Sequence, residues 1–179
     1  MQFKFIHHPL SQGIGMEGCR LVFENLPVVA ADPTDLEARI RMLSAASMGA
    51  VAFQKGLGAM HAMSHPCSVH FGTHHGMTNA VMMPYVLLAN RPAIEATMAR
   101  LAAYAGIGRT FDDLVAHVLA LRAELDVPHT LVDLGVDPAA ADTIVAGTVI
   151  DLCAATNPVT VDHDFATALF AAACEGRLD

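Results

Sequence analysis

Residues 56–90 read GLGAMHAMSHPCSVHFGTHHGMTNAVMMPYVLLAN, and this stretch carries the main indications of fold and chemistry. It contains no Asp, Glu, Lys or Arg, yet it holds five of the ten histidines of the chain, all between His61 and His75. Glycines and two prolines interrupt it, so it is not a bilayer-spanning helix. Histidine is the commonest metal ligand and a proton carrier near neutral pH, so the cluster favours a metal or catalytic site over unrelated histidines on a helix edge.

The remaining composition favours packed helices. The 179 residues are 54% hydrophobic and rich in Ala, Leu and Met, with no Trp and two Tyr. We therefore expect an all-α fold in which residues 1–179 form one helical domain. Ten scattered basic side chains against eighteen acidic ones argue against nucleic-acid binding. The chain shows no signal peptide and no CxxC pair, so we expect a cytoplasmic protein with reduced thiols, among which Cys67 is a buried filler.

Capping residues and prolines predict where the helices begin and end. Residues 1–13 are expected to be irregular. Thr34 with Glu37, and Thr110 with Asp113, have the spacing that opens a helix. We expect Pro27 to end the first predicted helix. Pro66 should end or kink the third. The predicted helices span residues 15–26, 35–54, 57–65, 76–89, 92–104, 111–125, 138–154 and 162–175.

The spacing of the histidines suggests unequal roles. His61 on a helix and His75 at the start of the next element have the placement of two metal ligands held by rigid backbones. His65 follows His61 by one helical turn and could reach a substrate oxygen without being a ligand. His70 and His74 are ambiguous. The HxxxH pair lacks the acidic residue of the HExxH proteases, so it lacks the base of that mechanism.

The same residues resemble the signature of a known family. A glycine pair, HAMSHP, then HHG about ten residues later and an apolar helix through Pro84 to Asn90 are similar to the motif of the iron-containing, or group III, alcohol dehydrogenases. The segments MEGCRLVFENLP, DLEARIRMLSAASMGAVAFQKGLG and FATALFAAACEGRL extend the resemblance over nearly the whole chain. The resemblance implies a helical bundle like the C-terminal domain of those enzymes, a dehydroquinate synthase-like fold.

The resemblance also implies roles for individual residues. In that family the first histidine of HxxxHP and the histidine of HG bind the metal, here His61 and His75, and the second histidine, here His65, lies by the nicotinamide and the substrate. The implied cofactor is a divalent metal, iron first and zinc as the alternative, which polarises an alcohol or aldehyde oxygen during hydride transfer with NAD or NADP. His65 would help to relay the proton. Phe53 and Lys55 fall near positions that line the cleft, although core packing and a charge at a helix end are their simpler interpretations.

The chain departs from the family pattern at two points. It has no strand followed by a glycine-rich phosphate loop, so we expect the N-terminal nucleotide-binding domain to be absent and NAD(P) to bind only with that domain. The family's other two ligands, an Asp and a His four residues apart, do not occur in residues 1–6, and His7 and His8 fit surface positions better than replacements. Two histidines should hold a metal weakly. We therefore expect a catalytic half that is inactive alone and that self-associates into a homo-oligomer through exposed apolar surface.

Two other interpretations stay open. The chain could be a non-catalytic helical module for binding or oligomerisation with a vestigial metal site, which metal retained after chelation would argue against. It could also follow the zinc-dependent glycerol dehydrogenases and dehydroquinate synthases, which share this architecture. The HAMSHP and HHG motifs resemble the iron-type alcohol dehydrogenases more closely.

Overall fold

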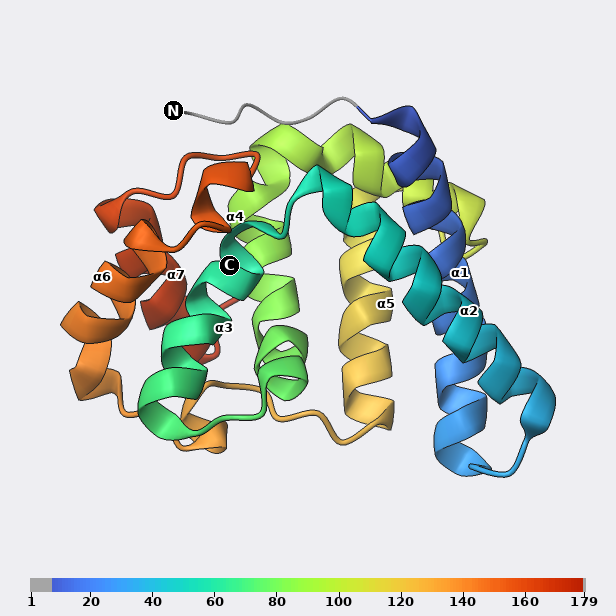
Figure 1. Cartoon of the computed structure of the whole chain (residues 1–179), viewed down its shortest axis with the longest axis horizontal. Helices are drawn as coiled ribbons and strands as arrows, with labels where there is room; N and C mark the ends of the chain where they lie inside the picture. The colour runs from blue at the N-terminus through green and yellow to red at the C-terminus, as the bar shows by residue number, and fades with distance from the viewer. Residues whose placement is uncertain (1–7, 179) are drawn as a thin grey trace. The chain divides into compact units, whose positions relative to one another are not determined.

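The computed structural model describes residues 8–178, which form helices joined by short connections (Figure 1). No strand occurs in that range, which confirms the all-α prediction. The α-helices are α1 (Pro9–Ala31), α2 (Leu36–Ala52), α3 (Gly58–Phe71), α4 (His75–Tyr104), α5 (Phe111–Glu124), α6 (Ala141–Ile150) and α7 (His163–Glu175). Short 3-10 helices lie between the α-helices: η1 (Phe53–Lys55), η2 (Val132–Leu134), η3 (Pro138–Ala140) and η4 (Ala154–Thr156). Among the described residues, no helix combines the length and apolar character that crossing a bilayer requires.

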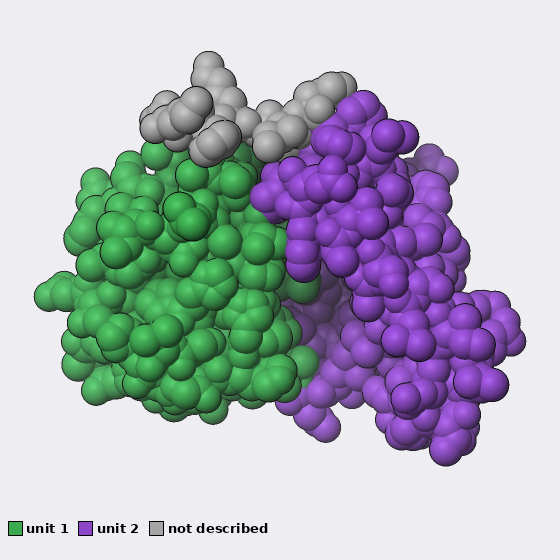
Figure 2. All heavy atoms as spheres, in the orientation of Figure 1, with its two compact units in different colours: residues 1–6, 57–94, 127–179 green, residues 7–56, 95–126 purple. Residues whose placement is uncertain are grey.

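The chain divides into two compact units, which Figure 2 shows in different colours. Within the described residues, unit 1 consists of residues 57–94 and 127–178, and unit 2 of residues 8–56 and 95–126. The helix α4 begins in unit 1 and ends in unit 2. The organisation of residues 1–179 as a single domain stays a prediction.

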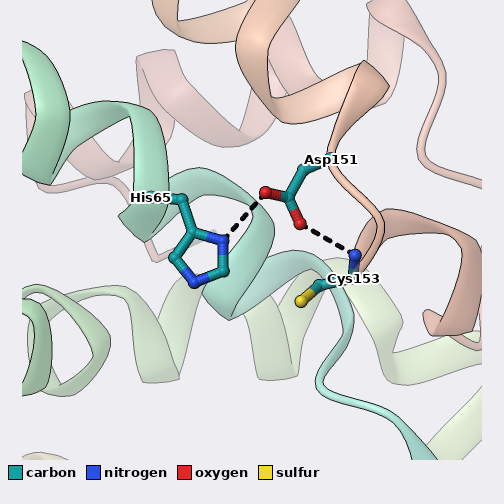
Figure 3. Close-up of side chains that lie close together, drawn as sticks. All are labelled: His65, Asp151 and Cys153. Carbon is teal, nitrogen blue, oxygen red and sulfur yellow. Dashed lines mark hydrogen bonds and ion pairs between the residues drawn. The ribbon is translucent and has the colours of Figure 1, made fainter.

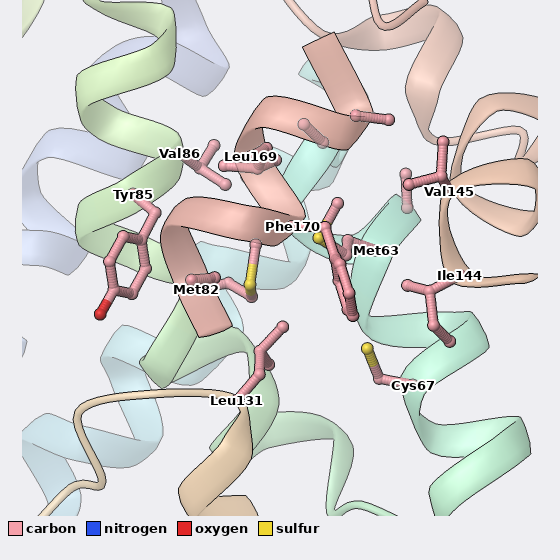
Figure 4. Close-up of a cluster of buried hydrophobic side chains, with 14 of the residues drawn as sticks. Met63, Cys67, Met82, Tyr85, Val86, Leu131, Ile144, Val145, Leu169 and Phe170 are labelled. Atoms are coloured by element: carbon pink, nitrogen blue, oxygen red, sulfur yellow. The ribbon is translucent and has the colours of Figure 1, made fainter. Parts of the chain in front are cut away.

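The core of unit 1 is built by α3, α4, α6 and α7 (Figure 4). Fully or almost fully buried side chains from these helices and from the loop before η2 meet there: Met63, Cys67, Met82, Tyr85, Val86, Leu131, Ile144, Val145, Leu169 and Phe170. Burying each large apolar side chain contributes roughly 1.5–3 kcal/mol. Cys67 has no exposed surface, which confirms its role as a filler. This core holds α3, the helix that carries HxxxH.

Unit 2 is held together by close packing of α1 against α2 and by a small cluster around α5. A Cβ atom at Gly18 would lie 3.3 Å from the Cβ of Met48, and one at Gly15 would lie 3.4 Å from that of Ala52, so glycines let the two helices approach. The buried residues Leu101, Ala102 and Leu114 form the second apolar cluster, with Met16, Cys19, Phe23, Met98 and Ile107 packed against it.

Prolines do not end the helices where the sequence predicts. Pro27 lies inside α1 and Pro66 inside α3, and α4 runs as one helix of 30 residues through Pro84 and Pro92, where two helices were predicted. An interior proline costs about 3 kcal/mol, which packing can offset. Pro66 is buried, and the small Gly147 of α6 faces it so closely that a Cβ atom there would lie 3.0 Å from the Cβ of Pro66.

The starts of α1 and α2 also differ from prediction. Residues 1–7 of the predicted irregular segment lie outside the described residues, but the chain is helical from Pro9, because the His8 ring accepts the backbone N–H of Ser11 and a proline opens the first turn. The predicted Thr34 cap is wrong. Asp35 caps α2 instead, since its carboxylate accepts the backbone N–H of Ala38 at 2.9 Å.

The later helix ends agree better with the sequence. Thr110 and Asp113 form a complete capping box at the start of α5, as predicted. Asp162 caps α7, and Gly176 ends it with a φ of 75°. The helix predicted over residues 138–154 is shorter than expected, because α6 covers only ten residues and the 3-10 helices η3 and η4 flank it.

Candidate functional site

Three of the predicted site histidines lie together at the junction of α3 and α4 in unit 1. Gly72 ends α3 with a φ of 66°, and α4 begins at His75 three residues later. The ring centroid of His61 lies 5.1 Å from that of His75 and 6.2 Å from that of His65, and the rings of His65 and His75 are stacked at 5.3 Å. His74 is exposed, and its Nδ1 accepts the backbone N–H of Met77.

The two proposed metal ligands direct their Nε2 atoms to one point. The side-chain nitrogen of Asn79, one turn into α4, lies 3.3 Å from Nε2 of His61 and 3.0 Å from Nε2 of His75. An amide nitrogen donates, so both Nε2 atoms act as acceptors and present their lone pairs. On its other side, Nδ1 of His75 lies 3.0 Å from the hydroxyl oxygen of Ser64. Two imidazole lone pairs that converge, one backed by a polar neighbour, fit a divalent metal.

The surroundings of His61 keep its ring neutral. Partial burial is the main cause that lowers its pKa, and positive charge on His75 or His65 would lower the pKa further. A hydrogen bond with the Leu57 backbone and the negative charge of Asp151 oppose this decrease only in part. Neutral imidazole is the form that binds metals, so the ring is available as a ligand at neutral pH.

The structure adds Asp151, which the sequence analysis missed. Its Oδ2 lies 2.8 Å from Nδ1 of His65, and its Oδ1 accepts the backbone N–H of Cys153 at 2.8 Å (Figure 3). Burial raises the pKa of Asp151, but the hydrogen bonds from His65 and Cys153 outweigh burial, so the pKa lies below its usual value. Asp151 is therefore an ionised partner of His65, placed by the end of α6.

Asp151, His65 and Cys153 also have the composition of a small metal site. One donor atom from each lies within 4.8 Å of the others. Burial, followed by the hydrogen bond and charge of Asp151, raises the pKa of the Cys153 thiol to about 11. Without a metal the sulfur is thus protonated at neutral pH, and a metal would bind it as the thiolate after displacing that proton. The side-chain contact that the structure shows within this group is the hydrogen bond between His65 and Asp151.

A buried pair of asparagines fixes the start of α3 to the segment that follows Asp151. The oxygen of Asn157 accepts the backbone N–H of Ala59 at 3.0 Å and the amide of Asn90 at 2.9 Å, and the Asn157 amide donates back to Asn90 at 2.7 Å. Thr156 accepts the backbone N–H groups of Leu57 and Gly58, both at 3.1 Å. These contacts fix the first turn of α3 against η4. They thereby fix the position of His65 along α3 relative to Asp151.

Phe53 and Lys55 lie in η1, which belongs to unit 2, while the histidines and Asp151 belong to unit 1. Phe53 is 55% exposed, so core packing is the wrong interpretation for it. Partial burial lowers the pKa of Lys55. Their place in a substrate pocket stays a prediction.

Comparison with known proteins relates this arrangement to one family. The sequence profile of the "Fe-containing alcohol dehydrogenase family, C-terminal" matches residues 3–174. A 4-hydroxybutyrate dehydrogenase of Cupriavidus necator is 35% identical over 84% of this chain, and alcohol dehydrogenase 4 of Schizosaccharomyces pombe is 31% identical over 93% of it. The chain spans 42% and 40% of the length of these two relatives.

Solved structures give the same relation. A 1,3-propanediol oxidoreductase superposes on 93% of this chain with a TM-score of 0.89 at 28% identity, and the match covers 46% of its own chain. An iron-containing alcohol dehydrogenase from Thermococcus thioreducens superposes on 95% with a TM-score of 0.85 at 30% identity, and the match covers 45% of that chain. The chain therefore belongs to the iron-containing alcohol dehydrogenase family and matches its C-terminal, all-α part.

Proposed function

We propose that this chain is the metal-binding half of an alcohol dehydrogenase that transfers hydride between an alcohol or aldehyde and NAD(P). The observation that carries the proposal is the convergence of Nε2 of His61 and Nε2 of His75 on one point, with the ring of His65 beside them. Family membership supports the reaction class, because the two curated relatives are dehydrogenases by name.

Each histidine has its own task in this proposal. His61 and His75 would hold the divalent metal, with iron first and zinc as the alternative. When bound, such a metal supplies Lewis-acid polarisation of an alcohol or carbonyl oxygen. His65 would accept the proton that an alcohol loses during oxidation and return it in the reverse direction. Its side chain is 41% exposed, so the ring is accessible from solvent for that exchange.

The coenzyme requires a further structural part. A dinucleotide site of the Rossmann type needs a strand, a tight turn and a helix, and none of residues 8–178 forms a strand. We therefore propose that NAD or NADP binds through a separate nucleotide-binding half, and that the 179-residue chain alone is inactive. Substrate contacts from Phe53 and Lys55 are part of the same proposal.

We also propose an oligomeric state and a cellular compartment, the first from the exposed apolar side chains and the second from the cysteines. Leu36, Ile40 and Leu43 on α2 are 70%, 53% and 70% exposed, and such an apolar surface supports self-association into a homo-oligomer. The four cysteines are free, which suits a reducing, cytoplasmic compartment.

Metal retention tests the central claim. The full chain is dialysed to equilibrium against a fixed concentration of Fe²⁺ under anaerobic conditions or of Zn²⁺, and the metal retained by the chain in excess of the dialysis buffer is measured, because a two-histidine site holds its metal weakly. Wild type should retain metal, His61→Ala and His75→Ala should lose it, and His70→Ala, which removes an exposed histidine of α3, should behave as wild type. Wild type that retains no more metal than His61→Ala or His75→Ala would overturn the metal role and leave the non-catalytic module as the better interpretation.

Activity tests the need for a nucleotide-binding half. The metal-loaded chain is mixed with NAD or NADP and short alcohols, and reduction of the nicotinamide is followed at 340 nm. We expect no turnover above that of free metal. Robust turnover by the chain alone would refute the requirement for a separate half.

A further inference from the structure

The bond between His65 and Asp151 determines which ring nitrogen of His65 carries the proton. An ionised carboxylate can only accept hydrogen bonds. Because Oδ2 of Asp151 lies 2.8 Å from Nδ1 of His65, a neutral His65 ring must donate from Nδ1. The other nitrogen, Nε2, is then left with its lone pair.

The carboxylate is held so that its two oxygens have different partners. Oδ1 accepts the backbone N–H of Cys153 at 2.8 Å, so Oδ2 is the oxygen that faces His65. The Asp151 side chain is only 18% exposed and follows directly after α6, which packs against α3 in the same unit. The ring of His65 is also restrained on its face, since it stacks on His75 with 14° between the planes.

We propose that Asp151 is a positioning residue, which fixes the neutral His65 ring with its proton on Nδ1 and keeps Nε2 as the acceptor for a substrate proton. The use of that acceptor rests on the proposed function, because only an alcohol substrate supplies the proton. The tautomer itself rests on the hydrogen bond between Nδ1 of His65 and the ionised carboxylate of Asp151. The step would be a proton transfer from the alcohol oxygen to Nε2 of His65, and a bound nicotinamide would accept the hydride of the carbinol carbon, so that charge and atoms balance.

Substitution of Asp151 by asparagine gives a sharp test. In Asp151→Asn, the side-chain oxygen must stay with the N–H of Cys153, so the new NH₂ group faces Nδ1 of His65. An NH₂ group donates, so it selects the opposite tautomer, with the proton on Nε2. An amide in place of a carboxylate beside a histidine is known to select the wrong tautomer in this way without changing the geometry.

The measurement is a long-range ¹H–¹⁵N spectrum of the ¹⁵N-histidine-labelled full chain without metal, at a pH where its imidazoles are neutral. The His65 signals are assigned as those lost in His65→Gln. Wild type should show a protonated Nδ1 and an unprotonated Nε2, and Asp151→Asn should show the reverse. The matched control is Asp137→Asn. At the start of η3, Asp137 accepts the backbone N–H of Ala139, two residues on, just as Asp151 accepts that of Cys153. It should leave His65 unchanged.

Two results would overturn the inference: a wild-type His65 with its proton on Nε2, or an Asp151→Asn chain whose other signals match wild type and whose His65 keeps the proton on Nδ1. A purely structural role for Asp151 predicts the second result. The readout involves neither metal nor coenzyme, so it can fail while metal retention succeeds. Loss of metal retention, in turn, would refute the proposed function and leave the tautomer assignment standing.

Discussion

Replacing Asn157 with alanine should destabilise unit 1 by about 3 to 5 kcal/mol. The substitution removes the acceptor of the Ala59 N–H and both partners of the Asn90 side chain. Asn90 is 4% exposed and Asn157 8%, so water does not replace those partners in the folded state without rearrangement. A buried polar group left without a partner costs about 1–3 kcal/mol, and three groups are affected, which gives about 3–9 kcal/mol. Rearrangement of the site should limit the loss to about 3–5 kcal/mol, because larger losses are exceptional for a single substitution. A loss of this size is a large fraction of the about 5–15 kcal/mol that stabilises a typical domain.

Urea unfolding, followed by far-ultraviolet circular dichroism, measures this loss as a decrease of the transition midpoint at unchanged slope. The matched control is Asn25→Ala in α1. Asn25 is 4% exposed like Asn90, but its amide donates only to the Leu21 carbonyl of its own helix, so about 1 kcal/mol is expected. The Asn90→Ala and Asn157→Ala double variant should cost less than the sum of the single variants, because each removes the other's partner.

Two outcomes would refute this reasoning. A cost for Asn157→Ala no larger than that for Asn25→Ala would show that the three hydrogen bonds of Asn157 with Ala59 and Asn90 do not stabilise the fold beyond a local contact. Strict additivity in the double variant would show that the two asparagines do not act as a pair. The slope of the free energy of unfolding against urea concentration reports the surface exposed on unfolding. An unchanged slope therefore shows that a shifted midpoint reflects a change in stability and not in cooperativity.

Three further predictions concern turns, metal and pH. Gly58→Ala should cost about 1–3 kcal/mol in thermal unfolding, more than Gly135→Ala, because both have positive φ but only Gly58 would place its Cβ 2.9 Å from a side-chain oxygen. Asn79→Ala should raise zinc affinity by up to about tenfold in calorimetry, since the metal no longer displaces two hydrogen bonds; weaker binding would contradict this. Hydrogen bonds, chiefly from Arg20, lower the pKa of Glu17 from 4.5 to about 2. The stability that Glu17 contributes is therefore fully present above pH 4.5 and is lost as the pH falls towards 2. Glu17→Gln should remove that part of the pH dependence of the urea midpoint, and an unchanged dependence would refute it.

Helix ends were predictable where the signal is local. Thr110 and Asp113 satisfy each other's backbone within four residues, so their spacing alone identified the start of α5. The predicted helix ends at prolines were wrong because the free-energy cost of a proline arises within its own helix, whereas the packing that offsets it comes from residues far along the chain. Pro66 remains helical beside Gly147, 81 positions further on, and no pattern around Pro66 announces that neighbour.

The candidate site shows the same limit. His61, His65 and His75 fall within fifteen residues on two consecutive helices, so the sequence could bring them together. Asp151 lies 86 residues from His65 and meets it only because α6 packs against α3. Asn79 was within reach of prediction, since it follows His75 by one helical turn, but an uncharged amide among apolar residues gives no chemical signal.

No side chain next to the start of α3 caps it. The backbone N–H groups of Leu57 and Gly58 bond to Thr156, and that of Ala59 bonds to Asn157, so each partner lies 98 or 99 positions further along the chain. A ribosome makes protein from the N-terminus, so the histidine helix leaves the exit tunnel long before the residues that cap it exist. During that interval, the N–H groups at its start can bond only to water. We therefore expect newly made chains to acquire an ordered histidine cluster only after synthesis has passed residue 157 and α6 has docked, so the site would mature late in biosynthesis.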